Sequence, residues 1–206
     1  MNYFFHSTFL AGIFIIPLTL FAQEEDWELK KEDDGIKVYT RAVEGTNIKE
    51  FKASTIINAS SESLYEIILD VENYPKWIED VEYAEKLYHK ENQIGMYYQL
   101  SLPWPMKDRD LAIVSNINRN TDNSILFELE GKSELMADDD EFIRISNING
   151  EWSIEPIDSN RSEVHYRFLA DPEGFLPAWV VNIFIVDGPF KTMQNLEEYA
   201  AALNHK

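Results

Sequence analysis

The sequence predicts an α+β fold in which a curved antiparallel β-sheet wraps around one long C-terminal α-helix. Three observations predict this fold. Short segments in which apolar and polar residues alternate with a period of two lie on both sides of one helical segment. Polar or glycine-bearing turns separate these segments. The chain closes with a helical segment, residues 177–206, whose first half is apolar on every side, so a sheet must cover one of its faces.

The predicted sheet begins with three strands. The stretch "WELKKEDDGIKVYTRAV", residues 27–43, contains two short strands around the turn "DDG" at 33–35. In "IKEFKASTIIN", residues 48–58, apolar residues alternate with charged and polar ones, which is typical of a strand with one buried face. We therefore expect a three-stranded meander in this part of the chain.

One helix follows these strands. Ser60 is a suitable N-cap residue, because its hydroxyl can accept a hydrogen bond from a free backbone N–H of the first turn. Pro75 is expected to end the helix. The buried face is predicted by apolar residues at helical spacing, namely Leu64, Ile67, Ile68 and Val71.

Period-two alternation returns between Val81 and Ala170, in six segments that polar or glycine-bearing turns separate. Strands joined by such short turns pair antiparallel, so we expect one long antiparallel sheet. The six predicted strands lie in "YAEKLYHKEN", "QIGMYYQLSLP", "RDLAIVSNINR", "SILFELEGKS", "EFIRISNINGEWSIEPI" and "RSEVHYRFLA".

The terminal helix is predicted from Pro177 to about Leu203. Pro177 stands at the expected first helical position, where a missing N–H has no cost. Pro189 lies inside the helix and lacks the N–H that a helix interior needs, which predicts a kink. The kink is either the hinge of a lid or a simple bend around the sheet.

The chain has 206 residues, a formal net charge of −19 and no cysteine. This length suits one domain that holds together through its core without disulfides. Its acidic surface repels nucleic acid and anionic headgroups, so we expect no nucleic-acid partner. We predict a monomer whose contact with membranes, if it visits them, is transient and made by apolar residues of the C-terminal helix.

Residues 1–22 contain no charged side chain, and their apolar run precedes the acidic stretch "QEEDW". This pattern is typical of a signal peptide that is removed after Ala22. Residues 23–206 would then be the mature domain, exported to the periplasm or secreted. The alternative is an uncleaved segment that anchors the protein in a membrane, for which the run is short.

Four segments in order carry a family resemblance: "GIKVYTR", "YPKWIEDV", "LPWPMKDRDLAIV" and "DPEGFLPAWVVN". Over nearly all of residues 23–206 the chain resembles START lipid-transfer domains, which have the helix-grip fold of the Bet v 1-like superfamily, and in particular a single-domain, exported, bacterial-type member. The resemblance implies a closed hydrophobic tunnel for one lipid or similar apolar molecule, with the terminal helix and a neighbouring loop as the lid. It implies no particular lipid, because this superfold also hosts polyketide cyclases, hormone receptors and allergen-like binders.

The pair Arg109-Asp110 begins a strand just after two prolines. Successive strand residues face opposite sides, so only one of the two charges is expected to point inward. An inward Arg109 would be a buried cation that needs a partner. It either anchors a headgroup, carboxylate or hydroxyl of a ligand, or forms an internal ion pair with Glu128, Glu134 or Asp171.

Strand alternation also nominates one inward face as the wall of the tunnel. The alternative is an ordinary packed core. Tyrosine and tryptophan favour a tunnel, because each brings a polar group that a dry core must satisfy. The predicted ligand-binding residues are Phe51, Met96, Tyr98, Leu100, Arg109, Phe127, Trp152, Tyr166, Phe168, Trp179, Ile183 and Phe184.

No catalytic motif is present: the sequence lacks HExxH, GxSxG, CxxC and a phosphate-binding glycine loop. The acidic run "ADDDEF" lacks the spaced ligands and glycine of a calcium loop. We therefore predict non-enzymatic binding of one apolar molecule, with transfer as an extension, and neither a cofactor nor a metal. Two alternatives stay open: a cyclase-like enzyme that uses the same cavity for acid-base chemistry, and a protein-interaction module with a filled core.

Overall fold

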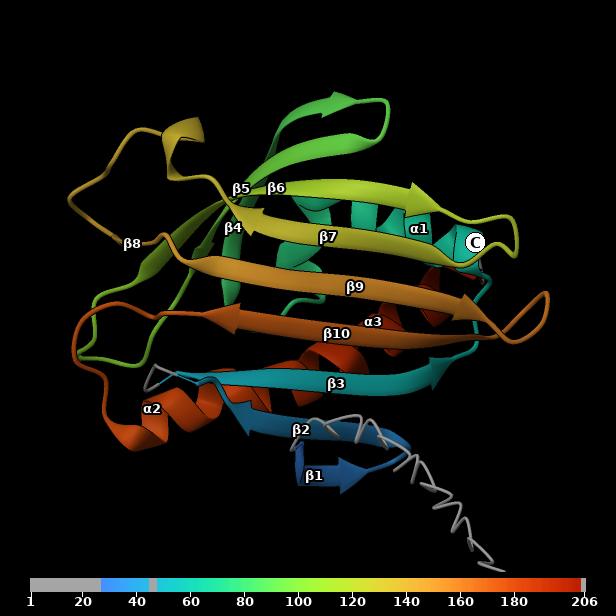
Figure 1. Ribbon diagram of the computed structural model, residues 1–206, viewed down its shortest axis with the longest axis horizontal. Helices are drawn as coiled ribbons and strands as arrows, with labels where there is room; N and C mark the ends of the chain where they lie inside the picture. The colour runs from blue at the N-terminus through green and yellow to red at the C-terminus, as the bar shows by residue number, and fades with distance from the viewer. Residues whose placement is uncertain (1–26, 45–47, 205–206) are drawn as a thin grey trace, which may run out of the picture.

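The computed structural model describes residues 27–44 and 48–204. The predicted signal peptide, residues 1–22, lies outside the described residues. The described chain forms one sheet of ten strands with the order β1-β2-β3-β10-β9-β7-β6-β5-β4, in which neighbours are antiparallel, and β8 pairs with β6 (Figure 1). The strands are β1 (Glu28–Asp33), β2 (Ile36–Ala42), β3 (Lys49–Ile57), β4 (Val81–Lys90), β5 (Gln93–Leu100), β6 (Arg109–Arg119), β7 (Ile125–Gly131), β8 (Ile143–Ile145), β9 (Ile148–Pro156) and β10 (Ser162–Ala170).

The predicted α+β architecture is confirmed, with one difference among the strands. The segment "EFIRISNINGEWSIEPI" was expected to form a single antiparallel strand, and it forms two. The first, β8, pairs parallel with the start of β6, with Asp110 opposite Arg144. The second, β9, continues the antiparallel sheet between β7 and β10. The division lies at Ser146 and Asn147, which are exposed.

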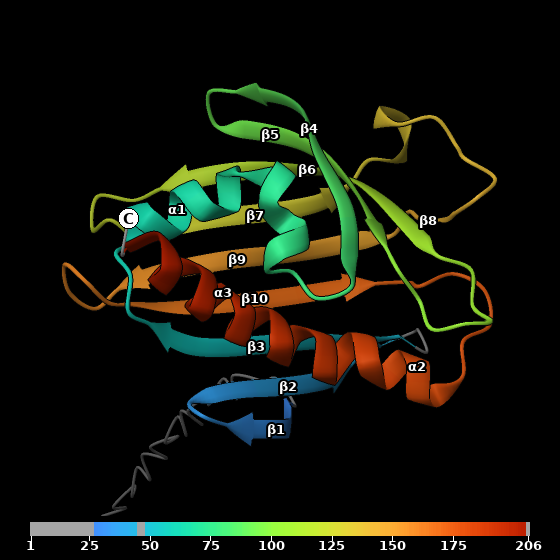
Figure 2. The same ribbon diagram turned by 180° about the vertical axis from the view of Figure 1, so that it is seen from behind.

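The helices pack against the concave face of the sheet (Figure 2). Helix α1 (Ser61–Leu69) begins as predicted, since the Ser60 hydroxyl accepts the N–H of Ser63 at 3.1 Å. It ends six residues before Pro75, however, because Asp70 leaves the helical conformation and accepts the Asn73 side-chain amide at 2.6 Å. Such local bonds of aspartate compete with a helix. A 3₁₀-helix, η1 (Val71–Lys76), follows and contains Pro75.

The terminal helix has three parts: α2 (Ala178–Asn182), a π-helical segment η3 (Ile183–Asp187) and α3 (Gly188–Asn204). Pro177 was expected at the first helical position. It is instead the N-cap residue, and α2 begins at Ala178. The irregularity predicted at Pro189 takes the form of the π-helical segment directly before it. There the Gly188 N–H donates to the carbonyl of Ile183, whereas in an α-helix it would donate to that of Phe184. Proline inside a helix and π-turns are both recognised causes of a local break in the regular α-helical hydrogen bonding.

The packed core fills only one end of the space between sheet and helices. There, α1 and α3 bring fully buried side chains such as Leu64, Met193 and Leu196 onto the sheet. At the other end lie α2, η3 and the loops that join β5 to β6 and β10 to α2 (Figures 1 and 2). Among the described residues, no helix combines the length and the apolar character that crossing a bilayer requires.

Candidate ligand-binding cavity

A cavity of about 1030 Å³ lies between the inner face of the sheet and the terminal helix. One wall is formed by inward residues of β3, β5, β6 and β10, and another by the loop 171–176. The helix closes the cavity with residues spaced by three or four positions, which share one helical face: Ala178, Val181, Ile185, Gly188 and Thr192.

The cavity opens at the end where β5 and β10 finish. Exposed residues, including Lys49 and Phe175, form part of its lining there. Inward residues lie two positions apart on each strand, so a side chain two positions further in lies about 7 Å deeper. Tyr98 is thus one step deeper than Leu100, and Tyr166 is two steps deeper than Ala170.

Seven of the twelve predicted ligand-binding residues line this cavity: Phe51, Tyr98, Leu100, Arg109, Tyr166, Phe168 and Phe184. Five do not. Met96, Phe127 and Trp152 are buried in the packed core, Ile183 lies on η3 outside the lining, and Trp179 is 54% exposed. Alternation identified the inward face correctly, but side chains of α1, of η1 and of Trp77 cover part of that face. Contact of the seven with a ligand stays a prediction.

Sequence reasoning also missed a part of the wall. The loop between β10 and α2 contributes Asp171, Pro172, Gly174, Phe175 and Leu176. A loop has no period-two signal, so alternation could not select these residues. The resembling segment "DPEGFLPAWVVN" covers them and was the available signal.

Arg109 faces the cavity and is buried, but its partners are not those expected. Its guanidinium donates to the backbone carbonyls of Pro172 at 2.7 Å and Glu173 at 2.9 Å, and to that of Lys107. No carboxylate of the described residues lies within ion-pair distance, so the expected ion pair with Glu128, Glu134 or Asp171 is not formed. Arg109 instead ties the start of the 171–176 loop to β6.

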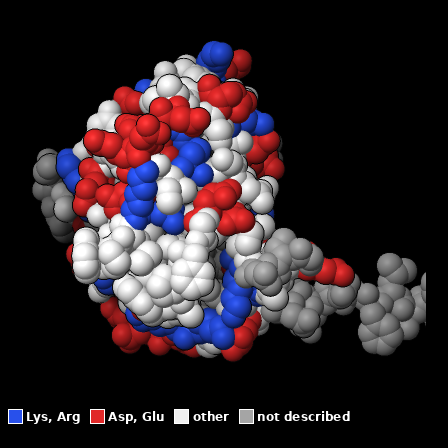
Figure 3. All heavy atoms as spheres, turned by 90° about the vertical axis from the view of Figure 1, so that its left-hand side faces the viewer, with Lys and Arg blue, Asp and Glu red and all other residues white. Residues whose placement is uncertain are grey.

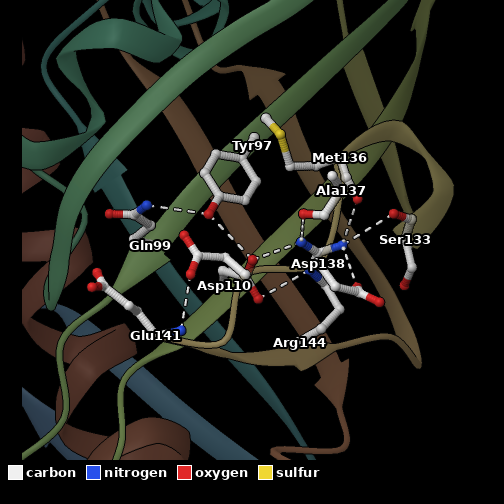
Figure 4. A network of polar contacts seen from close by, with 10 residues as sticks. Tyr97, Gln99, Asp110, Ser133, Met136, Ala137, Asp138, Glu141 and Arg144 are labelled. Carbon is white, nitrogen blue, oxygen red and sulfur yellow. Dashed lines mark hydrogen bonds and ion pairs between the residues drawn. The ribbon is translucent and has the colours of Figure 1, made fainter.

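Asp110 is buried as well, on the opposite face of β6. The Nε and Nη2 atoms of Arg144 bind its two carboxylate oxygens at 3.0 and 2.7 Å (Figure 4). Arg144 also donates to carbonyls of the segment that contains η2 (Ser133–Leu135), and the Tyr97 hydroxyl donates to Asp110 at 3.2 Å. Asp110 is thus the outward one of the two charges. It is buried because the 132–145 segment folds over it.

Comparison with known proteins defines the family. A model of the START domain matches residues 19–202. The chain belongs to the START domain family.

Relatives of this START domain cover most of its length. An uncharacterized protein of Pseudomonas aeruginosa is 30% identical over 179 residues, which are 87% of this chain and 89% of that protein. The human phosphatidylcholine transfer protein is 23% identical over 165 residues, 76% of this chain and 75% of that protein.

Solved structures share the fold of this START domain. The STAR-related lipid transfer protein of Xanthomonas axonopodis (fragment 25–204) superposes with a TM-score of 0.79 and 28% identity, covering 85% of this chain and 98% of that chain. Human StAR-related lipid transfer protein 5 gives a TM-score of 0.77 with 19% identity, and covers 90% of each chain.

An aromatic belt underlies the cavity of this START domain; it consists of Tyr98, Tyr74, Trp77, Trp152 and Tyr166. Consecutive ring centroids lie 6.1, 5.2, 5.6 and 3.9 Å apart. The two ends of the belt line the cavity, and its three middle members lie behind the wall. The belt therefore joins β5 to β10 across the concave face and separates the cavity from the packed core.

Gly150 shapes the same wall from β9. It pairs with Phe168 of β10 and faces inward. A Cβ atom at this position would lie 2.5 Å from the Phe168 ring and 2.8 Å from the Arg167 carbonyl oxygen. Only glycine leaves room for the Phe168 ring to lie across β9, where it forms part of the cavity lining.

Polar contacts hold the terminal helix of the START domain only from η3 onward. Lys31 of β1 binds Asp187 at 2.9 Å, and Lys191 binds Glu79 at 2.7 Å. The Thr192 hydroxyl accepts the Glu79 N–H at 3.1 Å. Within the described chain, residues 174–186 make no side-chain hydrogen bond or ion pair, so apolar packing alone holds α2 and the start of η3 over the cavity.

Proposed function

We propose that this START domain binds one lipid or a similarly long apolar molecule in its cavity, without converting it. The observation that carries the proposal is the cavity itself: about 1030 Å³, lined largely by aromatic and aliphatic side chains beneath the terminal helix. Pockets that enclose small molecules typically measure a few hundred to about 1,000 Å³ and are mostly apolar. The Xanthomonas structure, which covers 85% of the chain, is of a protein named for lipid transfer.

The test offers vesicles that contain sterols, fatty acids and phospholipids to residues 23–206, and native mass spectrometry then counts the bound molecules. We expect one lipid per protein. Val181→Trp, which places an indole on the cavity wall, should abolish binding, whereas Leu203→Trp at an exposed position of α3 should not. Failure of the unaltered protein to bind any of the three lipid classes would overturn the proposal.

The cavity lining supports binding over catalysis. None of the described histidines lines the cavity, and Glu155, Glu163 and His165, the described group that could hold a metal, lies on the other face of the sheet. Burial raises the pKa of Tyr98, which makes it a poor proton donor at neutral pH. Arg109 is engaged by backbone carbonyls. A cyclase-like reaction would need acid-base groups that converge on the ligand.

We also propose that the cavity mouth contacts membranes when the lipid enters or leaves. Trp104 in the β5–β6 loop is 91% exposed, Phe175 is 90% exposed and Trp179 is 54% exposed. Figure 3 shows a broad area without charged side chains on this end of the molecule. Arg109 bonds Lys107, Pro172 and Glu173, which brings the loops of Trp104 and Phe175 together. Exposed aromatic groups of this kind favour the membrane interface.

The membrane contact is tested by vesicle flotation of the double variant Trp104→Ser with Phe175→Ser. We expect weaker flotation than for the unaltered protein, and little effect of salt, because apolar contact is not screened. Tyr83→Ser removes an exposed aromatic ring elsewhere and should leave flotation unchanged. Equal flotation of the double variant and the unaltered protein would exclude this surface.

We infer export from residues 1–22, which are uncharged and largely apolar. Cell fractionation and N-terminal sequencing test the inference. A periplasmic or secreted protein that begins at Gln23 supports it, and a membrane-bound protein that retains these residues supports the anchored alternative. Size-exclusion chromatography with light scattering tests the proposed monomer in the same preparation.

A further inference from the structure

Tyr98 and Tyr166 stand at the inner part of the cavity wall on two strands that are far apart in the sheet. Tyr98 is 6% exposed and Tyr166 is 9% exposed, and both line the cavity. The aromatic belt connects the two rings across the concave face, from Tyr98 through Tyr74, Trp77 and Trp152 to Tyr166. Among the described residues that line the cavity, Tyr98 and Tyr166 are the two tyrosines.

Neither hydroxyl has a hydrogen-bond partner among the described residues. The third tyrosine of the belt differs, because the Tyr74 hydroxyl donates to the Ile68 carbonyl at 2.7 Å. In the described chain, the fully enclosed side-chain polar atoms without a partner are Trp77 Nε1 and Ser115 Oγ. The two phenol oxygens are not among them, so they are open to the cavity. A buried hydroxyl without a partner costs free energy that a ligand can recover.

The Tyr166 ring is held in place. Trp152 stacks on it at 3.9 Å with the planes 4° apart, and Phe51 packs against it at 5.1 Å in an edge arrangement. Stacking covers a face of the ring, which leaves the hydroxyl as its most available recognition group. A rigid ring also holds the hydroxyl in position before the ligand arrives, which lowers the cost of ordering.

The inner cavity offers no free cation to a charged ligand. Arg109 and Lys49 are the cationic residues of the described lining, and both stand at the entrance, where Arg109 binds carbonyls and Lys49 is exposed. Burial raises the pKa of both tyrosines, so they remain neutral hydroxyls that can donate and accept. Glu79 and Asp80 also line the cavity and would repel an anion.

We propose that Tyr98 and Tyr166 together bind an uncharged oxygen group of the ligand, a hydroxyl or a carbonyl, at the inner end of the cavity. The ligand is therefore a long apolar molecule with a neutral oxygen function that enters first, and an anionic headgroup does not occupy this site. The inference rests on the proposed function, and it adds the polar group that the cavity selects.

The test uses four probes that share one sixteen-carbon chain, presented in phosphatidylcholine vesicles: hexadecane, hexadecan-1-ol, hexadecyl phosphate and hexadecyltrimethylammonium. We expect the unaltered protein to take up hexadecan-1-ol in preference to the other three. Tyr98→Phe and Tyr166→Phe should each weaken hexadecan-1-ol binding roughly fivefold, the value of one hydrogen bond, and leave hexadecane binding unchanged. Tyr74→Phe is the matched control, because its hydroxyl is already bonded within the protein.

Two results would overturn the inference while the proposed function stands. One is binding of hexadecan-1-ol that neither Phe variant weakens. The other is stronger binding of hexadecyl phosphate or hexadecyltrimethylammonium than of hexadecan-1-ol. Stronger binding of the cationic hexadecyltrimethylammonium would indicate that aromatic ring faces or Asp80 recognise the ligand. Failure of every probe, and of the lipids tested above, to bind the unaltered protein would overturn the proposed function itself.

Discussion

The indole of Trp152 stacks on the phenol ring of Tyr166, with ring centroids 3.9 Å apart and ring planes 4° apart. The two residues are cross-strand partners on β9 and β10. Tyr166 lines the cavity, and Trp152 supports it from the packed core. The wall that contacts the ligand and the core that stabilises the fold are therefore continuous.

Trp152→Ala should lower the free energy of unfolding by about 3–5 kcal/mol, because it leaves a large void behind Tyr166. Urea denaturation measures the loss. Trp104→Ala removes the same side chain from a position that is 91% exposed, and should change stability by no more than about 0.5 kcal/mol. Equal losses in the two variants would contradict the buried, stacked position of Trp152.

The three tyrosines of the aromatic belt should respond differently to loss of the hydroxyl. Tyr74→Phe breaks the bond to the Ile68 carbonyl and should lower the free energy of unfolding by about 1–3 kcal/mol, since that buried carbonyl loses a partner. Tyr98→Phe and Tyr166→Phe remove hydroxyls without protein partners and should have nearly no effect on the ligand-free protein. Thermal melts of delipidated protein compare the three, and a loss at Tyr98 as large as that at Tyr74 would contradict the assignment.

Arg109→Met should release the entrance loop. The carbonyls of Pro172 and Glu173 lose their donor, so we expect a loss of about 1–3 kcal/mol in stability. Hydrogen exchange of Glu173 to Leu176 should become faster. Arg109→Lys keeps the charge but lacks the planar fork that reaches several carbonyls, so it should show most of the same effect. Unchanged melting and exchange in Arg109→Met would show that the guanidinium does not hold the loop.

The ion pair of Asp110 and Arg144 should be strongly coupled. Arg144→Met leaves a buried carboxylate without its cation, which costs about 3–5 kcal/mol. Adding Asp110→Leu removes the stranded charge, so the double variant should be more stable than Arg144→Met alone. A double-mutant cycle by urea denaturation gives the coupling energy. Purely additive losses would mean that the two side chains act independently.

The first half of the terminal helix is expected to be the gate of the cavity. Amides of residues 178–186 should exchange with solvent faster than those of residues 190–203, because apolar packing alone holds the former. An engineered disulfide from position 183 to β3, which η3 contacts, should block ligand exchange between vesicles while the far-UV circular dichroism stays unchanged. Ligand exchange at the same rate in the oxidised and reduced protein would place entry elsewhere, for instance at the loops of Trp104 or Ala137.

The sequence by itself determined the order of the elements and the inward face of each strand. Alternation placed Tyr98, Tyr166 and Phe168 on the concave side, because a side chain's face follows from its position in the strand. Local chemistry placed the start of α1 at Ser60 and an irregularity at Pro189, since a cap and a missing N–H act within one turn. The family resemblance predicted the cavity and the helix that covers it.

Only the tertiary structure decided which part of the inward face is cavity and which is core. Met96, Phe127 and Trp152 have the same parity as the cavity residues, but Tyr74, Tyr65 and Trp77, respectively, pack against them. Two partners of Arg109 lie 63 and 64 residues away on an irregular loop, and Arg144, the ion-pair partner of Asp110, lies on β8, a strand that pairs parallel with β6. Such contacts depend on how distant segments pack, and a local pattern specifies the direction of a side chain but not what covers it.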